Sequence, residues 1–346
     1  MKRTELGSIG EFGLIHRLSQ SVKIKNSSTQ KGIGDDAAVI AHGKQSTVIS
    51  TDLLVEGIHF DMTYTPLKHL GYKAVVVNLS DVYAMNAHPT QITVSIALSN
   101  RFSVEAIEEL YEGIHTACQY YGVDLVGGDT ASSLRGLVIS ITAVGAADAS
   151  ELVYRSGAKM GDILCVTGDL GAAYLGLQVL EREKQVYLET PAMQPKLEAD
   201  NYIIARLLKP EARKDIIAFF RKASLVPTSM LDVSDGLSSD LIHLCQQSNV
   251  GALVEEAQVP IHQKTYQKAL DFKFDPIICA LHGGEDYELL FTIDPKDLEK
   301  IRFQTDIKML GEITPKEDGI QLHTKGGRLM PLVAQGWRHF QRDGEE

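Results

Sequence analysis

Hydrophobic residues along the chain follow two alternating patterns. Six short segments are rich in β-branched residues and bounded by polar residues or glycine, which predicts strands at 47–52, 89–98, 123–128, 136–145, 162–168 and 228–235. Between them, apolar residues recur every three or four positions, the period of amphipathic helices. Helices are expected from about Pro66, capped by Thr65, to about Met85, from Ser103 to Gly122, and from about Gly236 onward. The alternation predicts a mixed α/β fold.

A domain junction is expected near the middle of the chain. The segment 146–162 is polar and rich in small residues, and it lies between two predicted strands. A length of 346 residues suits two domains. We therefore expect an N-terminal domain over 1–148 and a C-terminal domain over 149–346. The polar segment 183–200 is an insertion whose structure the pattern leaves open.

The composition of the chain excludes some kinds of binding partner. The net charge of −11 argues against nonspecific binding to nucleic acid or to a membrane, because both demand a basic face. Phosphate ligands remain compatible if divalent cations lie between them and the carboxylates. No stretch resembles a signal peptide or a membrane span of roughly 20 apolar residues, which predicts a cytoplasmic protein. The cysteines lack CxxC spacing and are expected to be inert: Cys118, Cys165, Cys245 and Cys279.

Acidic residues gather where predicted strands end. They are Asp52, Asp129, Asp232 and Asp235, together with Asp35 and Asp36 in a GIGDDAA turn. Open α/β sheets bind ligands beyond the carboxyl ends of their strands, where loops bring side chains together. Any one of these residues could instead cap a turn or a helix. Six such positions together favour a shared site.

Asp81 lies in the segment AVVVNLSDVYAMNA, where nearly every neighbour one helical turn away is apolar or small. A carboxylate in such surroundings must be paired, metal-bound or neutralised, because burying it alone costs several kcal/mol. The alternative is that Asp81 caps a new helix after a break near Asn78.

Clustered carboxylates would require cations. Two of them about 4 Å apart repel by roughly 4 kcal/mol at an effective dielectric constant near 20. Oxygen ligands that include Ser50 and Thr51, without His or Cys at ligand spacing, favour magnesium. The sequence has no GxxxxGK[ST] loop and no kinase HRD or DFG motif, so metal ions would neutralise the phosphates. Gly127 and Gly128 permit close backbone approach, and the helix after Asp235 offers amide groups to an anion.

These motifs together resemble one family. In order along the chain they are GIGDDAA, STDLLVEGIHF, NLSDVYAMNA, VGGDT, RSGAKMGD, DVSDGLSSDL and HGGEDYELLF, and the likeness runs from about Gly10 to Trp337. They resemble the thiamine-monophosphate kinases, whose superfamily includes aminoimidazole ribonucleotide synthetase and selenophosphate synthetase. The resemblance implies an N-terminal mixed sheet that pairs across a homodimer and a C-terminal α/β sandwich domain. It also implies Mg²⁺-dependent transfer of a phosphoryl group from ATP to thiamine monophosphate.

The resemblance assigns roles to individual residues. The implied magnesium ligands are Asp36, Ser50, Thr51, Asp52, Asp81, Asp129, Asp232 and Asp235. The implied ATP contacts are Tyr111, Gly128, Asp129, Arg155 and Ser234. The implied acceptor contacts are His59, Glu285 and Trp337. Without the resemblance, Tyr111 and Trp337 would be packing residues and His59 a satisfied polar residue. One departure is Asn86, at a position where the family has a small, glycine-like residue.

The expected mechanism is direct in-line transfer without a covalent enzyme intermediate. No Cys or Ser lies beside a base in a recognisable motif, and metal-bound carboxylates would be poor nucleophiles.

Two alternatives remain at this point. The first is another ATP-using enzyme of the superfamily, but selenophosphate synthesis would need a reactive N-terminal cysteine, and the first cysteine is Cys118 in a predicted helix. The second is a maturation or scaffold protein acting through partner binding, whose relatives carry a C-terminal cysteine that WRHFQRDGEE lacks. A binding module with decayed chemistry should have lost some of the acids. Turnover of ATP with thiamine monophosphate would separate these readings.

Overall fold

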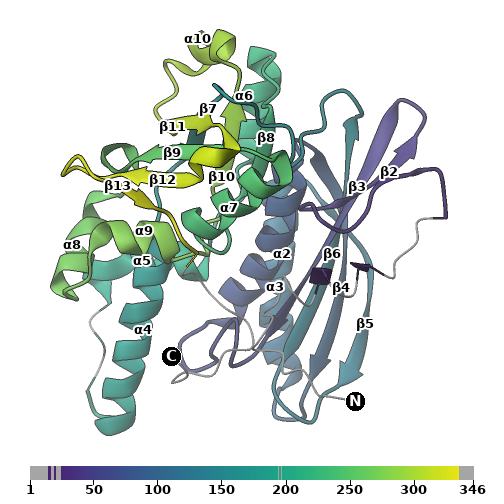
Figure 1. Cartoon of the computed structure of the whole chain (residues 1–346). Coiled ribbons are helices and arrows are strands. Elements are labelled where there is room, and N and C mark those ends of the chain that lie inside the picture. Colours follow the sequence, from purple (N-terminus) through teal and green to yellow (C-terminus); the bar gives the residue numbers. More distant parts are fainter. Residues whose placement is uncertain (1–14, 17–18, 21–24, 194, 196, 335–346) are drawn as a thin grey trace, which may run out of the picture.

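The computed structural model describes residues 15–16, 19–20, 25–193, 195 and 197–334. It contains two β-sheets with helices packed against them (Figure 1). The expected mixed α/β fold is confirmed. Within the described ranges, no helix combines the length and the apolarity needed to cross a membrane.

The first sheet has six strands in the order β1-β2-β3-β6-β4-β5. Neighbouring strands are antiparallel except β4 and β5, which are parallel. The strands are β1 (Thr29–Lys31), β2 (Ala38–His42), β3 (Gln45–Val55), β4 (His88–Leu98), β5 (Asp124–Ser132) and β6 (Val138–Asp148).

Two long helices cover one face of this sheet, α2 (Leu67–Ala84) and α3 (Val104–Tyr121) (Figure 1). They approach closely because glycines lie at the crossing: a Cβ on Gly71 would stand 1.9 Å from the Leu110 carbonyl oxygen. Helix α2 is buried on nearly all sides, since it also contacts strand β8 of the second sheet. This central helix carries Asp81 into the contact between the two sheets.

The second sheet has seven strands in the order β13-β12-β9-β11-β7-β10-β8, and only β9 and β12 run parallel. The strands are β7 (Ile163–Thr167), β8 (Ser229–Asp232), β9 (Gly251–Glu255), β10 (Leu289–Ile293), β11 (Ile307–Thr314), β12 (Ile320–His323) and β13 (Leu329–Pro331). The helices are α4 (Ala172–Glu189), α5 (Asn201–Leu208), α6 (Lys214–Ala223), α7 (Leu237–Ser248), α8 (Gln263–Asp271), α9 (Pro276–His282) and α10 (Leu298–Ile301).

The three predicted helices correspond to α2, α3 and α7, and one predicted cap is wrong. The cap of α3 is confirmed, because the Ser103 side chain accepts a hydrogen bond from the Ala106 amide at 3.2 Å. Helix α2 instead has Pro66 at its N-cap, without a side-chain hydrogen bond. The Thr65 hydroxyl is buried and makes no hydrogen bond. Proline fixes its own φ near −65°, so this start does not depend on a capping hydroxyl.

The predicted strands correspond to β3 through β8. The expected linker 146–162 begins with the last residues of β6, and β7 starts at Ile163. The boundary after residue 148 stays a prediction. The segment 183–200 includes the end of α4 and a 3-10 turn at Glu198–Asp200. All four cysteines are unpaired and buried, as expected.

Candidate functional site

Three carboxylates from different parts of the fold meet where the two sheets approach one another. Asp36 precedes β2, Asp81 lies in α2, and Asp232 ends β8. Each offers one oxygen atom, and these atoms lie within 4.8 Å of one another. We call these three residues the acid cluster. Because β8 is the edge strand of the second sheet, the cluster lies between the two sheets rather than within either one.

Serine side chains hold two of the acids in place. The Ser50 hydroxyl of β3 donates a hydrogen bond to Oδ2 of Asp81. The Ser80 hydroxyl donates to Oδ2 of Asp232 at 2.5 Å and so links α2 to β8.

Arg155 holds the third acid of the cluster. Its Nε and Nη2 donate to the two carboxylate oxygens of Asp36 at 3.0 and 2.8 Å. Its backbone amide donates to Oδ1 of the adjacent Asp35 at 3.0 Å. Paired, planar hydrogen bonds of this kind fix the orientation of a carboxylate as well as its charge.

The acid cluster is crowded with negative charge. Burial, and then the charge of Asp36, raises the pKa of Asp232 to about 7. The same two causes raise the pKa of neighbouring Asp52 to about 6. The pKa of Asp81 is raised well above its ordinary value by burial and then by the charges of Asp52, Asp232 and Asp36.

This electrostatic setting fits a divalent cation. Burial and mutual repulsion both disfavour the ionised carboxylates, and a bound cation would remove the repulsion. The donor atoms are all oxygen, which is the preference of Mg²⁺. The residues present therefore fit the predicted magnesium site.

The alternative interpretation of Asp81 as a helix cap is wrong. Helix α2 runs without a break through Asn78 to Ala84. The Asn78 side chain is buried and donates to the Ala74 carbonyl oxygen at 3.0 Å, while its own oxygen accepts the Asp52 amide at 2.9 Å. Asn78 thus ties the helix that carries Asp81 to the strand that carries Ser50 and Asp52.

Three other predicted metal ligands, Thr51, Asp129 and Asp235, are not part of the acid cluster. Side chains alternate across a strand, so Ser50 and Thr51 point to opposite faces of β3. The Thr51 hydroxyl donates to the Ile141 carbonyl oxygen at 3.0 Å. Asp129 is exposed on the edge strand β5, and Asp235 is half-buried in the loop before α7. Metal binding by these three residues stays a prediction.

The predicted ATP contacts are spread over both sheets. Gly128 lies where β5 approaches β4, since a Cβ there would stand 1.8 Å from the Val94 carbonyl oxygen. Strand packing alone therefore accounts for this glycine. Tyr111 is half-buried and packs against the hydrophobic core, as the periodicity alone would suggest. Ser234 follows β8, two residues beyond Asp232. The roles of these residues toward ATP stay predictions.

Glu285, a predicted acceptor contact, is bonded to the loop that follows Asp232 of the acid cluster. Its backbone amide donates to the Ser234 carbonyl oxygen at 2.7 Å. Its carboxylate pairs with the ammonium group of Lys73, a residue of α2 that is only 4% exposed. His59 is half-buried, and its Nδ1 accepts the Val55 amide at 3.0 Å. Trp337 lies outside the described residues.

Sequence reasoning missed two charged residues near this site. Lys73 lies in the same apolar helix as Asp81, so the argument that singled out Asp81 also applied to it. Asp240 of α7 is buried, and its Oδ2 accepts the Asp235 amide at 3.2 Å. The repeated acids of DVSDGLSSD were the available signal for Asp240. The departure at Asn86 is also explained, because this residue has a φ of 54°, a conformation that favours glycine or asparagine.

Comparison with known proteins first defines a class. Residues 34–147 match the family model described as AIR synthase related protein, N-terminal domain. This range covers the first sheet from before β2 almost to the end of β6, including Asp36 and Asp81 of the acid cluster. This part of the chain is therefore similar to the N-terminal domain of AIR-synthase-related proteins.

Full-length relatives define the family within that class. The thiamine-monophosphate kinase of Aquifex aeolicus is 35% identical over 335 residues, 97% of this chain and 99% of the relative. That of Bacillus subtilis is 33% identical over 340 residues, 95% of this chain and 99% of the relative. A solved structure described as AaThiL complexed with AMPPCP and TMP has a TM-score of 0.84 and 31% identity, covering 98% of this chain and all of that one. The chain belongs to the thiamine-monophosphate kinase family, as the motifs predicted.

Proposed function

We propose that this kinase transfers the γ-phosphoryl group of ATP directly to the phosphate of thiamine monophosphate, forming thiamine pyrophosphate. The observation that carries the proposal is the acid cluster, in which one oxygen atom of each of three carboxylates lies within 4.8 Å of the others. The Glu285–Lys73 pair is joined to the loop after Asp232 through the Ser234 carbonyl oxygen. The similar structure described as complexed with AMPPCP and TMP supports both the nucleotide and the acceptor.

Mg²⁺ would be held by Asp36, Asp81 and Asp232, with Asp52 close by. When bound, several such ions would neutralise the phosphates of both substrates, so that two polyanions can approach. The protein's own contribution is orientation: Ser50 and Ser80 fix two of the carboxylates through their hydroxyl groups.

Direct transfer is favoured by the chemistry of both partners. The acceptor is a phosphate oxygen that is already largely ionised near neutral pH, so no general base is required. A thiolate intermediate is disfavoured because burial raises the pKa of Cys118 and Cys279 to about 11 and that of Cys165 and Cys245 to about 12. The ionised carboxylates of the cluster serve as cation ligands.

Glu285 and His59 would select the vitamin part of the acceptor. Thiamine carries a positively charged thiazolium ring, and Glu285 offers a carboxylate whose partner in this structure is the Lys73 ammonium. The substrate cation would then take up an interaction that Lys73 makes in its absence. Trp337 remains a further predicted contact.

The first prediction concerns the acceptor. We expect ADP release to depend on thiamine monophosphate and to be negligible with free thiamine, because the acceptor phosphate is one of the groups that the cations hold. A coupled assay of ADP over a panel of phosphorylated vitamins and nucleotides measures this. With γ-labelled ATP and no acceptor, the denatured protein should retain no label. Equal turnover of free thiamine, or turnover that survives excess EDTA, would contradict the proposal.

The second prediction is a homodimer formed through the first sheet. Strand β5 is the edge of that sheet and is exposed along almost its whole length, with Val126 61% exposed. An exposed edge strand pairs readily with another chain. Light scattering should give a particle of twice the 38.0 kDa of one chain.

A matched pair of variants tests which surface forms the dimer. Val126→Asp should shift the particle toward the monomer, because it places a charge on the proposed interface. Val104→Asp changes an equally apolar, 71% exposed residue at the start of α3 and should leave the dimer intact. A monomeric wild-type protein at micromolar concentration would refute the dimer.

A further inference from the structure

The segment 284–288, which carries Glu285, has an unusual backbone. Glu285 and Tyr287 have φ values of 58° and 53°, and Gly284 before them has 72°. Left-handed conformations are unfavourable for a residue with a side chain, and they persist only where the surroundings impose them. The contacts on both sides of the segment must therefore hold it in place.

One side of the segment is bonded to the loop that follows the acid cluster's β8. The Tyr287 amide donates to the Val233 carbonyl oxygen at 2.9 Å, and the Val233 amide donates to the Glu288 carbonyl oxygen at 2.7 Å. Together with the bond from the Glu285 amide to Ser234, these contacts fix the segment relative to Asp232.

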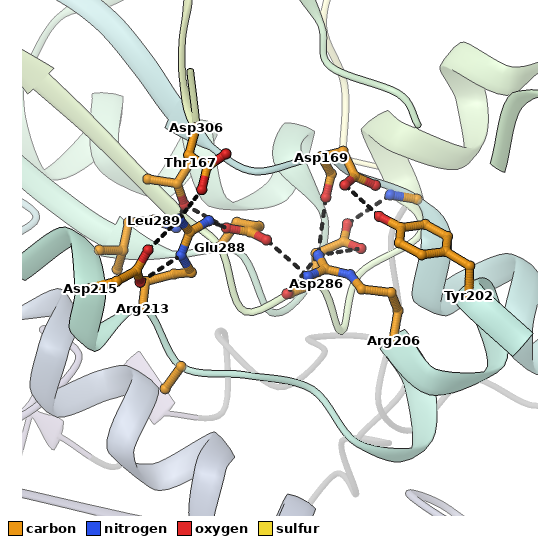
Figure 2. Close-up of polar contacts among 12 residues, drawn as sticks. Thr167, Asp169, Tyr202, Arg206, Arg213, Asp215, Asp286, Glu288, Leu289 and Asp306 are labelled. Atoms are coloured by element: carbon orange, nitrogen blue, oxygen red, sulfur yellow. Dashed lines mark hydrogen bonds and ion pairs between the residues drawn. The ribbon is translucent and has the colours of Figure 1, made fainter. Parts of the chain in front are cut away.

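The other side of the segment faces two arginines, the half-buried Arg206 and the buried Arg213 (Figure 2). Nη1 of Arg206 pairs with Oε1 of Glu288 at 2.9 Å. Nη1 of Arg213 pairs with Oε2 of the same carboxylate at 2.6 Å. The Asp286 carboxylate accepts the Gly171 amide at the start of α4, at 2.9 Å. Glu285 pairs with Lys73 of α2, so successive side chains anchor the segment to different parts of the protein.

The two arginines differ in what they hold. Nη2 of Arg206 also donates to the carbonyl oxygens of Asp286 and Asp169, at 3.2 and 3.1 Å. The remaining contacts of Arg213 are with the carboxylates of Asp215 and Asp306. Arg206 therefore donates a hydrogen bond to the main chain next to Glu285, whereas Arg213 contacts the segment through the Glu288 side chain.

We propose that Arg206 is a positioning residue for the acceptor half of the active site. By holding the Asp286 carbonyl oxygen and the Glu288 carboxylate at once, it keeps Glu285 in the left-handed conformation that aims its carboxylate at α2. This inference rests on the proposed function, because that function makes Glu285 an acceptor contact. Lysine keeps the charge but lacks the planar fork that reaches a carboxylate and two carbonyl groups together.

Arg206→Lys and Arg213→Lys form a matched pair for the test. Because the lost main-chain contacts are hydrogen bonds from a charged group, Arg206→Lys should raise the KM for thiamine monophosphate about tenfold or more. The KM for ATP should change by less than about twofold, because Glu285 is a predicted contact of the acceptor and not of ATP. Hydrogen exchange at the Glu285 and Tyr287 amides should become faster. Arg213→Lys should lower the melting temperature without moving the acceptor KM or these exchange rates.

The outcomes separate a positioning role from a purely structural one. If the two variants lose similar stability and neither changes the acceptor KM or the exchange of 284–288, the proposal is wrong. If Arg206→Lys does not fold, Tyr202→Phe is the variant to measure. It removes only the hydroxyl that donates to Asp169 at 2.6 Å, and the carbonyl oxygen of Asp169 is one of the main-chain groups that Arg206 holds. Faster exchange of 284–288 in Tyr202→Phe supports the proposal, and unchanged exchange overturns it. If the wild-type protein does not phosphorylate thiamine monophosphate, the proposed function is wrong. The hydrogen-exchange rates of 284–288 in the variants would still test whether Arg206 positions this segment.

Discussion

Asp232→Asn is expected to lower kcat/KM by at least about a hundredfold, since removal of one preorganised electrostatic group in an active site commonly costs that much. The metal-free variant should also melt at a higher temperature than the metal-free wild type. Asp232 is only 2% exposed, and its ionised form is disfavoured by burial and by Asp36. Asparagine keeps the shape and an oxygen that can accept the Ser80 hydroxyl, while it removes the repelling charge. Loss of activity together with a gain in stability is the signature of a functional carboxylate.

Steady-state kinetics and thermal melts of the same preparations measure both effects. The control is Asp148→Asn, which changes an exposed acid at the end of β6 and should alter neither quantity. A variant that loses activity only because it melts at a much lower temperature, with unchanged affinity for Mg²⁺, would make Asp232 a structural residue.

The sequence predicts best those elements that local rules define. Helix α3 has a serine at its start and a glycine with a φ of 73° just past its end, and both signals were visible in the sequence. The N-cap of α2 was misassigned by one residue because threonine is a common cap, whereas here Pro66 is the N-cap and the helix begins at Leu67.

The strands that were missed depend on distant partners. Strand β12 has only four residues and lies parallel to β9, which precedes it by some 70 residues of chain. No local pattern encodes such a pairing. Strand β1 was missed for another reason, because its three residues are too few to show an alternating pattern.

The site shows the same limit. Strand-ending acids and the apolar surroundings of Asp81 were sufficient to predict a shared acidic site. They could not tell which face of a strand turns toward it, so Ser50 and Thr51 were treated alike although only Ser50 contacts Asp81. The ion pair between Arg206 and Glu288 joins α5 to the start of β10, and only the tertiary structure brings these residues together.

The stability of the metal-free protein should fall as the pH rises from about 5 to about 8. The folded protein raises the pKa of Asp52 to about 6 and that of Asp232 to about 7, from an ordinary value of 3.8. At pH values between the ordinary pKa and the raised pKa, the folded state binds more protons than the unfolded state. The contribution of Asp52 and Asp232 to stability is therefore present at low pH and lost as the pH rises through about 6 and about 7. The loss is on the order of a few kcal/mol, because one pH unit of pKa difference corresponds to about 1.4 kcal/mol.

Mg²⁺ should therefore stabilise the wild-type protein much more at about pH 8 than at about pH 5, because protons and the cation compete for the same carboxylates. Melting temperatures with saturating Mg²⁺ and with EDTA, taken at both pH values, measure this difference. Other groups also titrate over this range, so the comparison that isolates the acid cluster is between wild type and Asp232→Asn. The variant should show a smaller pH dependence without metal and a smaller Mg²⁺ effect at the higher pH. An identical Mg²⁺-induced shift at both pH values, or in both proteins, would place the bound cation somewhere other than among Asp36, Asp81 and Asp232.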